Sequence, residues 1–144
     1  MVRPAPAQHH GDVAREAMFN TVYVLERDTA ECRWIESALK GQVRTLVFLD
    51  DGATLLDWLE AQGGDCLLCG AEPDASVALE LVRSLRRHGQ GLPVVVLGPH
   101  SAFRTAGDVA RLDGTDFLER PVSAQRLRSA LRKVTVVAED GAKR

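Results

Sequence analysis

GTDFLERP at residues 114–121 and LPVVVLGP at residues 92–99 are two short segments that each end at proline. Such segments are typical of short buried strands that stop at a Gly or Pro. The residues between them are compatible with one helix, which is the spacing of a strand-helix-strand crossover. In sheets of this kind, functional groups lie at the carboxyl ends of the strands. Gly98 and Arg120 occupy two such ends and are therefore candidate functional positions.

Apolar runs and helical patterns alternate along the rest of the chain. The predicted strands are residues 21–25, 43–48, 66–69, 92–98 and 114–119. The predicted helices cover about residues 29–40, 53–61, 77–87, 102–112 and 124–137. This alternation with short connections favours a three-layer α/β domain with a parallel sheet. The polar residues Arg44 and Thr45 interrupt the second strand, which suggests that it lies at the edge of the sheet.

Local signals predict where helices begin and which residues face inward. Asp28 with Glu31 three residues later resembles a capping box, and Ser123 is the expected N-cap of the last helix. Helical spacing predicts these inward-facing residues: Trp34, Ile35, Ala38, Leu39, Leu55, Leu56, Leu59, Val77, Ala78, Leu81, Leu85, Phe103, Ala106, Val109, Leu127, Ala130, Leu131 and Val134.

Length and composition indicate one globular domain. The chain has 144 residues, of which 45% are hydrophobic and 26% charged, and its net charge is -2. We expect a domain at residues 20–137, a flexible extension at residues 1–19 and a polar tail at residues 138–144. No apolar run reaches the roughly 20 residues of a membrane span, and no signal peptide is evident, so the expected location is the cytoplasm.

Several residues could bind a metal, but each has a plainer structural interpretation. Cys66 and Cys69 share one strand, where positions three apart point to opposite faces, so these thiols and Cys32 are expected to be structural. Asp50 and Asp51 suit a turn and a helix N-cap better than a metal site. No glycine-rich phosphate-binding loop follows a strand, and no cofactor is predicted.

The element order and the motif DFLERP at residues 116–121 resemble the receiver domain of bacterial two-component response regulators. The resemblance covers about residues 20–137 and includes VYVL at residues 22–25 and ALEL at residues 78–81. It implies a flavodoxin-like sheet of five parallel strands in the order 2-1-3-4-5, with five helices.

In the receiver family, a phosphoryl group is transferred to an Asp after the third strand. Acids after the first strand hold Mg²⁺, and a hydroxyl and a Lys follow the fourth and fifth strands. By resemblance, the acidic pair falls on Glu26 and Arg27, the phosphoacceptor on Gly70, the hydroxyl on Gly98 and the Lys on Arg120. These residue types predict a degenerate receiver that is not phosphorylated, is not an enzyme and binds no metal there.

Three further expectations concern the same positions. Glu26 and Arg120 have matched positions at the strand ends and are predicted to form an ion pair. A displaced acid, Asp74 or Glu72, could still accept a phosphoryl group, although loop and capping roles suit both. Alternatively, the space left by Gly70 and Gly98 could bind a small anion or nucleotide beside Arg27 and Arg120.

The receiver resemblance also predicts an interaction surface on the fourth helix, fifth strand and last helix. Its candidate residues here are Arg104, Arg111, Phe117, Arg128 and Arg132. Phe117 holds the position of the family's switch aromatic, or is simply a core side chain. We expect a protein partner or an output domain, with a homodimer as one form, and no direct nucleic-acid binding. Basic residues gather in the later helices, which indicates a solvated helix face first and a binding patch second.

Overall fold

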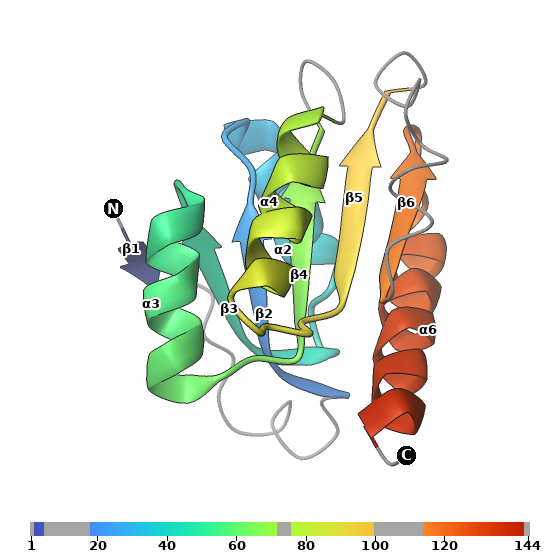
Figure 1. Cartoon of the computed structure of the whole chain (residues 1–144). Helices are drawn as coiled ribbons and strands as arrows, with labels where there is room; N and C mark the ends of the chain where they lie inside the picture. Colours follow the sequence, from blue (N-terminus) through green and yellow to red (C-terminus); the bar gives the residue numbers. More distant parts are fainter. Residues whose placement is uncertain (1, 5–17, 72–75, 100–113, 143–144) are drawn as a thin grey trace.

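The computed structural model describes residues 2–4, 18–71, 76–99 and 114–142. Its strands are β1 (Val2–Pro4), β2 (Phe19–Leu25), β3 (Val43–Leu49), β4 (Cys66–Gly70), β5 (Val94–Gly98) and β6 (Thr115–Glu119). Its helices are α2 (Thr29–Ala38), α3 (Gly52–Gln62), α4 (Ser76–Arg87) and α6 (Ala124–Ala142). Helices α3 and α4 cover one face of the sheet, and α2 and α6 cover the other (Figure 1). The predicted helix at residues 102–112 lies outside the described residues.

The sheet confirms the predicted parallel order. Strands β3, β2, β4, β5 and β6 are neighbours in that order, which is the flavodoxin-like arrangement 2-1-3-4-5. Each neighbouring pair in this series is parallel. The order reverses between β2 and β4, and this is where open α/β sheets place their functional sites.

The first residues of the chain correct one prediction. Val2–Pro4 forms β1 and pairs antiparallel with β3, so this part of the extension is a strand and β3 is not the edge. The sequence gives little sign of β1, because its three residues are too few to show a strand periodicity. Its partner β3 nevertheless offers a row of backbone donors and acceptors that a short strand can satisfy.

Two apolar clusters fill the space on either side of the sheet. One lies under α2 and α6, and the other under α3 and α4. Cys66 belongs to the first cluster and Cys69 to the second, which confirms that these thiols point to opposite faces. The continuously apolar β4 and β5 are buried because helices cover both faces of the sheet.

Two helices differ from their sequence patterns. In α4 the buried residues are Ala78, Leu79, Val82 and Leu85. Val77 was predicted to face inward, but it is 64% exposed, because at about 100° per residue it lies on the side of α4 away from the buried Leu79 and Val82. Helix α6 continues to Ala142, so residues 138–142 are helical and not a separate tail. No proline interrupts this segment, and a helix tolerates the single Gly141 at a cost of roughly 1 kcal/mol.

Candidate functional site

The five candidate residues Glu26, Arg27, Gly70, Gly98 and Arg120, here called the strand-end site, gather at the carboxyl edge of the sheet. Gly70 and Gly98 end β4 and β5, and Glu26 and Arg120 directly follow β2 and β6. Backbone hydrogen bonds fix the alignment of these ends. The Arg120 N–H donates to the Gly98 carbonyl at 2.8 Å, which continues the β5–β6 ladder by one residue.

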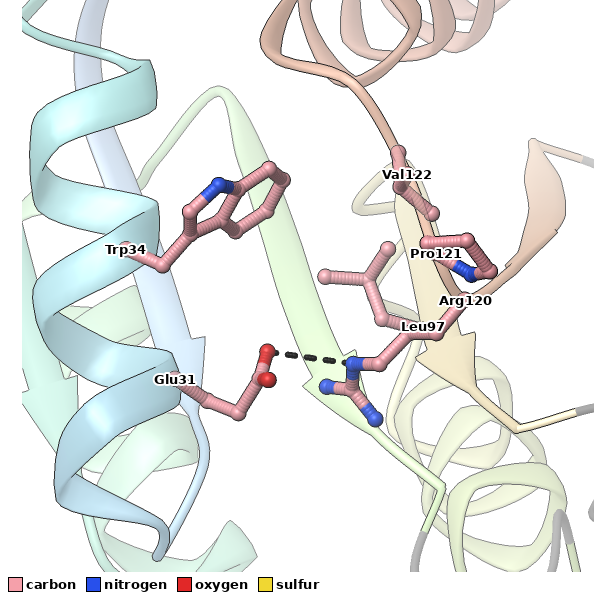
Figure 2. Close-up of a pocket in the computed structure, with 6 residues that line it drawn as sticks. All are labelled: Glu31, Trp34, Leu97, Arg120, Pro121 and Val122. Atoms are coloured by element: carbon pink, nitrogen blue, oxygen red, sulfur yellow. Dashed lines mark hydrogen bonds and ion pairs between the residues drawn. The ribbon is translucent and has the colours of Figure 1, made fainter.

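An ion-pair network crosses the strand-end site. Arg120 Nη2 lies 3.1 Å from Glu26 Oε1, which confirms the predicted pair. Arg120 Nε lies 3.0 Å from Glu31 Oε2 in α2 (Figure 2). The Glu26 side chain is only 6% exposed and that of Arg120 20%, so the pair is largely removed from water. One guanidinium therefore ties β2, α2 and β6 together.

Glu31 is the residue of this network that sequence reasoning missed. Its spacing from Asp28 suggested a reciprocal capping box, and Asp28 does accept from the backbone N–H groups of Ala30 and Glu31. The return bond is different, because the Asp28 N–H donates to Glu26 Oε2 at 3.0 Å. With that donor already satisfied, the Glu31 carboxylate is available to Arg120. No local sequence signal could reveal a partner 89 residues away.

Gly70 faces the Glu26 carboxylate at close range. A Cβ atom built on Gly70 would overlap Glu26 Oε1 and stand 3.0 Å from Glu26 Cδ. The space that a side chain at residue 70 would enter is thus occupied by Glu26. The Glu26 carboxylate cannot swing away freely, since Arg120 and the Asp28 N–H hold its two oxygens.

The residues of this site do not fit a magnesium ion. Mg²⁺ requires oxygen ligands in near-octahedral geometry, and the one acid of the site is Glu26, whose oxygens are already engaged. Nearby, Asp51 is the N-cap of α3 and accepts from the Thr54 N–H at 2.8 Å, as predicted. This hydrogen bond lowers the pKa of Asp51. In the described ranges no three His, Cys, Asp or Glu side chains form a metal-binding group.

Two hollows adjoin the strand-end site. A cavity of about 400 Å³ lies between Trp34 of α2 and the Pro121-Val122 segment, with the Arg120–Glu31 pair on one side (Figure 2). A larger hollow of about 920 Å³ extends from Gly70 along α4. Its charged lining residues include four acids and two arginines: Glu26, Asp50, Asp51, Glu80, Arg27 and Arg87. Arg120 does not line the larger hollow, so that space is not the cationic pocket that the sequence suggested.

The thiol of Cys69 lies next to this network and is inert as an acid. Burial, with a smaller contribution from the Glu26 carboxylate, raises the pKa of Cys69 to about 12. Burial likewise raises the pKa of Cys66 well above its ordinary range. Both thiols therefore stay protonated at neutral pH, consistent with the structural role predicted for them.

The predicted interaction surface is described in part. Phe117 is half-buried and packs against the apolar cluster under α3 and α4. Arg132 is exposed, and Arg128 is half-buried with its Nε donating to the Ala124 carbonyl at 3.3 Å. Arg104, Arg111, Glu72 and Asp74 lie outside the described residues.

Comparison with known proteins places these features in a family. The family model of the response regulator receiver domain matches residues 22–132. The transcriptional regulatory protein FixJ of Bradyrhizobium diazoefficiens is 23% identical over 122 residues, which are 85% of this chain and 60% of FixJ. The DNA-binding transcriptional regulator NtrC of Escherichia coli K12 is 28% identical over 101 residues, covering 69% of this chain and 21% of NtrC.

A solved structure shares the same fold. The crystal structure of full-length FixJ from B. japonicum superposes with a TM-score of 0.73 at 23% identity, over 85% of this chain and 61% of that one. The present chain thus spans less than two thirds of these relatives. No helix in the described part of the chain is both long and apolar enough to cross a bilayer.

Proposed function

This chain belongs to the response regulator receiver domain family, and from that premise we propose that it is a phosphorylation-independent signalling module. In this role it binds a partner protein or an output domain, and it catalyses no reaction of its own. The proposal keeps the receiver scaffold and assigns a structural task to the edge where other members carry out phosphoryl transfer.

The contact between Glu26 and Gly70 carries this proposal. A phosphoacceptor needs a carboxylate at residue 70, and the chain has a glycine there whose side-chain space is taken by Glu26. Phosphoryl transfer also needs a cation that can neutralise the charge developing on the phosphoryl oxygens. Arg120 is the cation at the matching position, and two carboxylates already bind its guanidinium. The site therefore contains its own anion.

The anion or nucleotide sensor is less well supported than the interaction module. An anion would have to compete with Glu26 and Glu31 for Arg120. Both carboxylates belong to the same chain as Arg120, and the fold holds them beside it. Arg27 is exposed and is the remaining cation of the strand-end site. A single exposed arginine among several acids gives weak selectivity for an anion.

Intact-mass spectrometry after incubation with acetyl phosphate and Mg²⁺ tests the proposal. We expect the protein mass to be unchanged, while a receiver with an ordinary Asp site gains one phosphoryl group under the same conditions. A stable phosphoryl adduct would overturn phosphorylation independence. In that case the Asp74→Asn and Glu72→Gln variants would show whether a displaced acid is the acceptor.

The partner could also be a second copy of this chain. Light scattering over a range of concentrations tests this form, since a homodimer would have twice the 15.7 kDa mass of one chain. A strict monomer at high concentration would direct the search to another protein.

A further inference from the structure

Helix α6 carries four basic residues on the part of its surface away from the core, Arg126, Arg128, Arg132 and Lys133, here called the α6 basic stripe. The buried residues of α6 up to residue 135 are Leu127, Ala130, Leu131 and Val134. At about 100° per residue, Arg128 and Arg132 lie on one flank of this buried side, and Arg126 and Lys133 lie on the other, with Gln125 and Ser129 between the two pairs. Three members of the stripe are exposed, and Arg128 is half-buried.

The stripe does not stabilise the helix that carries it. Arg126 lies in the first turn, where the helix dipole disfavours a positive charge. Arg128 and Arg132 are four residues apart, and like charges at that spacing destabilise a helix. Residues 124–135 contain no acid that could offset these charges. Helix stability alone therefore does not account for this distribution of basic residues.

The rest of the described molecule leaves the stripe's charges without an acidic partner. Within the described ranges no salt bridge involves a member of the stripe; the pairs found there include Arg87 with Glu80 and Arg120 with Glu26 and Glu31. The guanidinium of Arg128 makes one bond to a backbone carbonyl, which leaves its charge unpaired. The stripe thus offers several Arg and Lys donors to a ligand from outside.

We propose that the α6 basic stripe docks an acidic face of a partner protein, such as a helix with glutamates along one side. This rests on the proposed function, because it takes the α6 face as the interaction surface and specifies the chemistry of its partner. Arginine suits the role, since its planar fork binds carboxylates with two parallel hydrogen bonds. A symmetric dimer centred on α6 would place two stripes against each other, and such like-charge contact disfavours a second copy.

A protein surface fits the stripe better than nucleic acid does. From Arg126 to Lys133 the helix rises only about 10 Å, so the stripe contacts few phosphates at once. Non-specific DNA binding comes almost entirely from neutralised phosphates, and the four basic residues of the stripe can neutralise few of them. The chain as a whole is also acidic, with a net charge of -2 and a pI of about 6.1, and gives no long-range attraction to a polyanion.

Fluorescence anisotropy with a labelled helical peptide that carries glutamates along one face tests the proposal on the full chain. We expect salt-sensitive binding, and no binding of the matched peptide with glutamines in place of the glutamates. The double variant Arg126→Glu/Arg132→Glu should lose affinity by about tenfold or more. The control Lys40→Glu/Arg83→Glu changes the net charge equally at two exposed sites outside α6 and should retain binding.

Three results would overturn the inference: no peptide binding, equal loss in both double variants, or stripe-dependent binding of a short DNA duplex that is tighter than that of the peptide. Circular dichroism of each variant checks that α6 remains folded. The acetyl phosphate experiment distinguishes a failure of the docking inference from a failure of the proposed function. An unmodified mass together with no peptide binding would contradict the acidic partner but not phosphorylation independence. A phosphoryl adduct together with stripe-dependent binding would contradict phosphorylation independence but not the acidic partner.

Discussion

Arg120 and the arginines of the α6 basic stripe have the same side chain in opposite environments. Arg120 is largely buried, and two carboxylates of its own chain bind it. Arg126 and Arg132 are exposed and have no acidic partner within the described residues. An arginine's contribution to a protein depends on where its counter-charge lies. An internal counter-charge fixes the fold, and a missing one leaves the arginine available for a partner.

The physical basis of this difference is desolvation. A buried carboxylate has lost its water, so removing its partner leaves an uncompensated charge. An exposed arginine keeps its hydration shell and loses little when it is replaced. The two regions should therefore respond very differently to mutation.

Replacing Arg120 with alanine should cause the largest loss of stability. The Arg120→Ala variant leaves Glu26 buried without its partner, and we expect a decrease of about 3 kcal/mol in the free energy of unfolding. Urea denaturation measures this decrease in the free energy of unfolding. The control Arg87→Ala breaks the exposed pair with Glu80, whose side chains are both more than 60% exposed, and should cost less than about 1 kcal/mol. Equal costs for the two variants would erase the distinction between the regions.

A side chain at residue 70 should also destabilise the strand-end site. In Gly70→Ala the new methyl group collides with the anchored Glu26 carboxylate, and we expect a loss of about 2 kcal/mol. Gly91→Ala is the matched control, because a Cβ there meets no atom within 4 Å. Thermal unfolding of the two variants compares their stabilities. A Gly70→Ala variant as stable as Gly91→Ala would mean that Glu26 moves easily and that the site is not locked.

Alkaline pH should weaken the buried region that contains Cys69. The pKa of Cys69 rises to about 12 in the folded state from an ordinary value of 9.0, so the unfolded chain loses this proton first. The resulting stability is fully present below pH 9 and is lost as pH rises toward 12, by on the order of 1 kcal/mol at pH 10. Urea titrations at pH 8 and pH 10 measure this decrease.

The Cys69→Ala variant should show a smaller decrease between these two pH values. Cys66→Ala is a second check, because burial raises the pKa of that thiol too. An unchanged pH dependence in both variants would contradict the burial argument.

Charge reversal on α6 should have the smallest effect on stability. We expect Arg126→Glu/Arg132→Glu to change the free energy of unfolding by no more than about 0.5 kcal/mol. A slight gain is reasonable, since the double variant removes the repulsion between Arg128 and Arg132 and places an acid in the first turn. Denaturation of this variant beside Arg120→Ala tests both sides of the comparison. A large loss here would give the stripe a structural role and weaken its assignment as a docking surface.

Local sequence patterns were enough to predict the order of the elements and the positions at the strand ends. Apolar runs and helical spacing are local patterns, and they predicted the parallel sheet and the N-caps at Asp51 and Ser123. The pair between Glu26 and Arg120 was also predictable, because parallel strands bring their carboxyl ends to one edge.

The folded arrangement of the whole chain sets how side chains reach across that edge. It directed Glu31 away from a capping box toward Arg120, and it placed the Glu26 carboxylate in the space beside Gly70. It also paired β1 with β3 and left Val77 exposed. These outcomes depend on distances between residues far apart in the chain, and a local pattern contains no such distances. The basic residues of the α6 stripe can be read from the sequence, but the folded structure is needed to show that they have no acidic partner among the described residues.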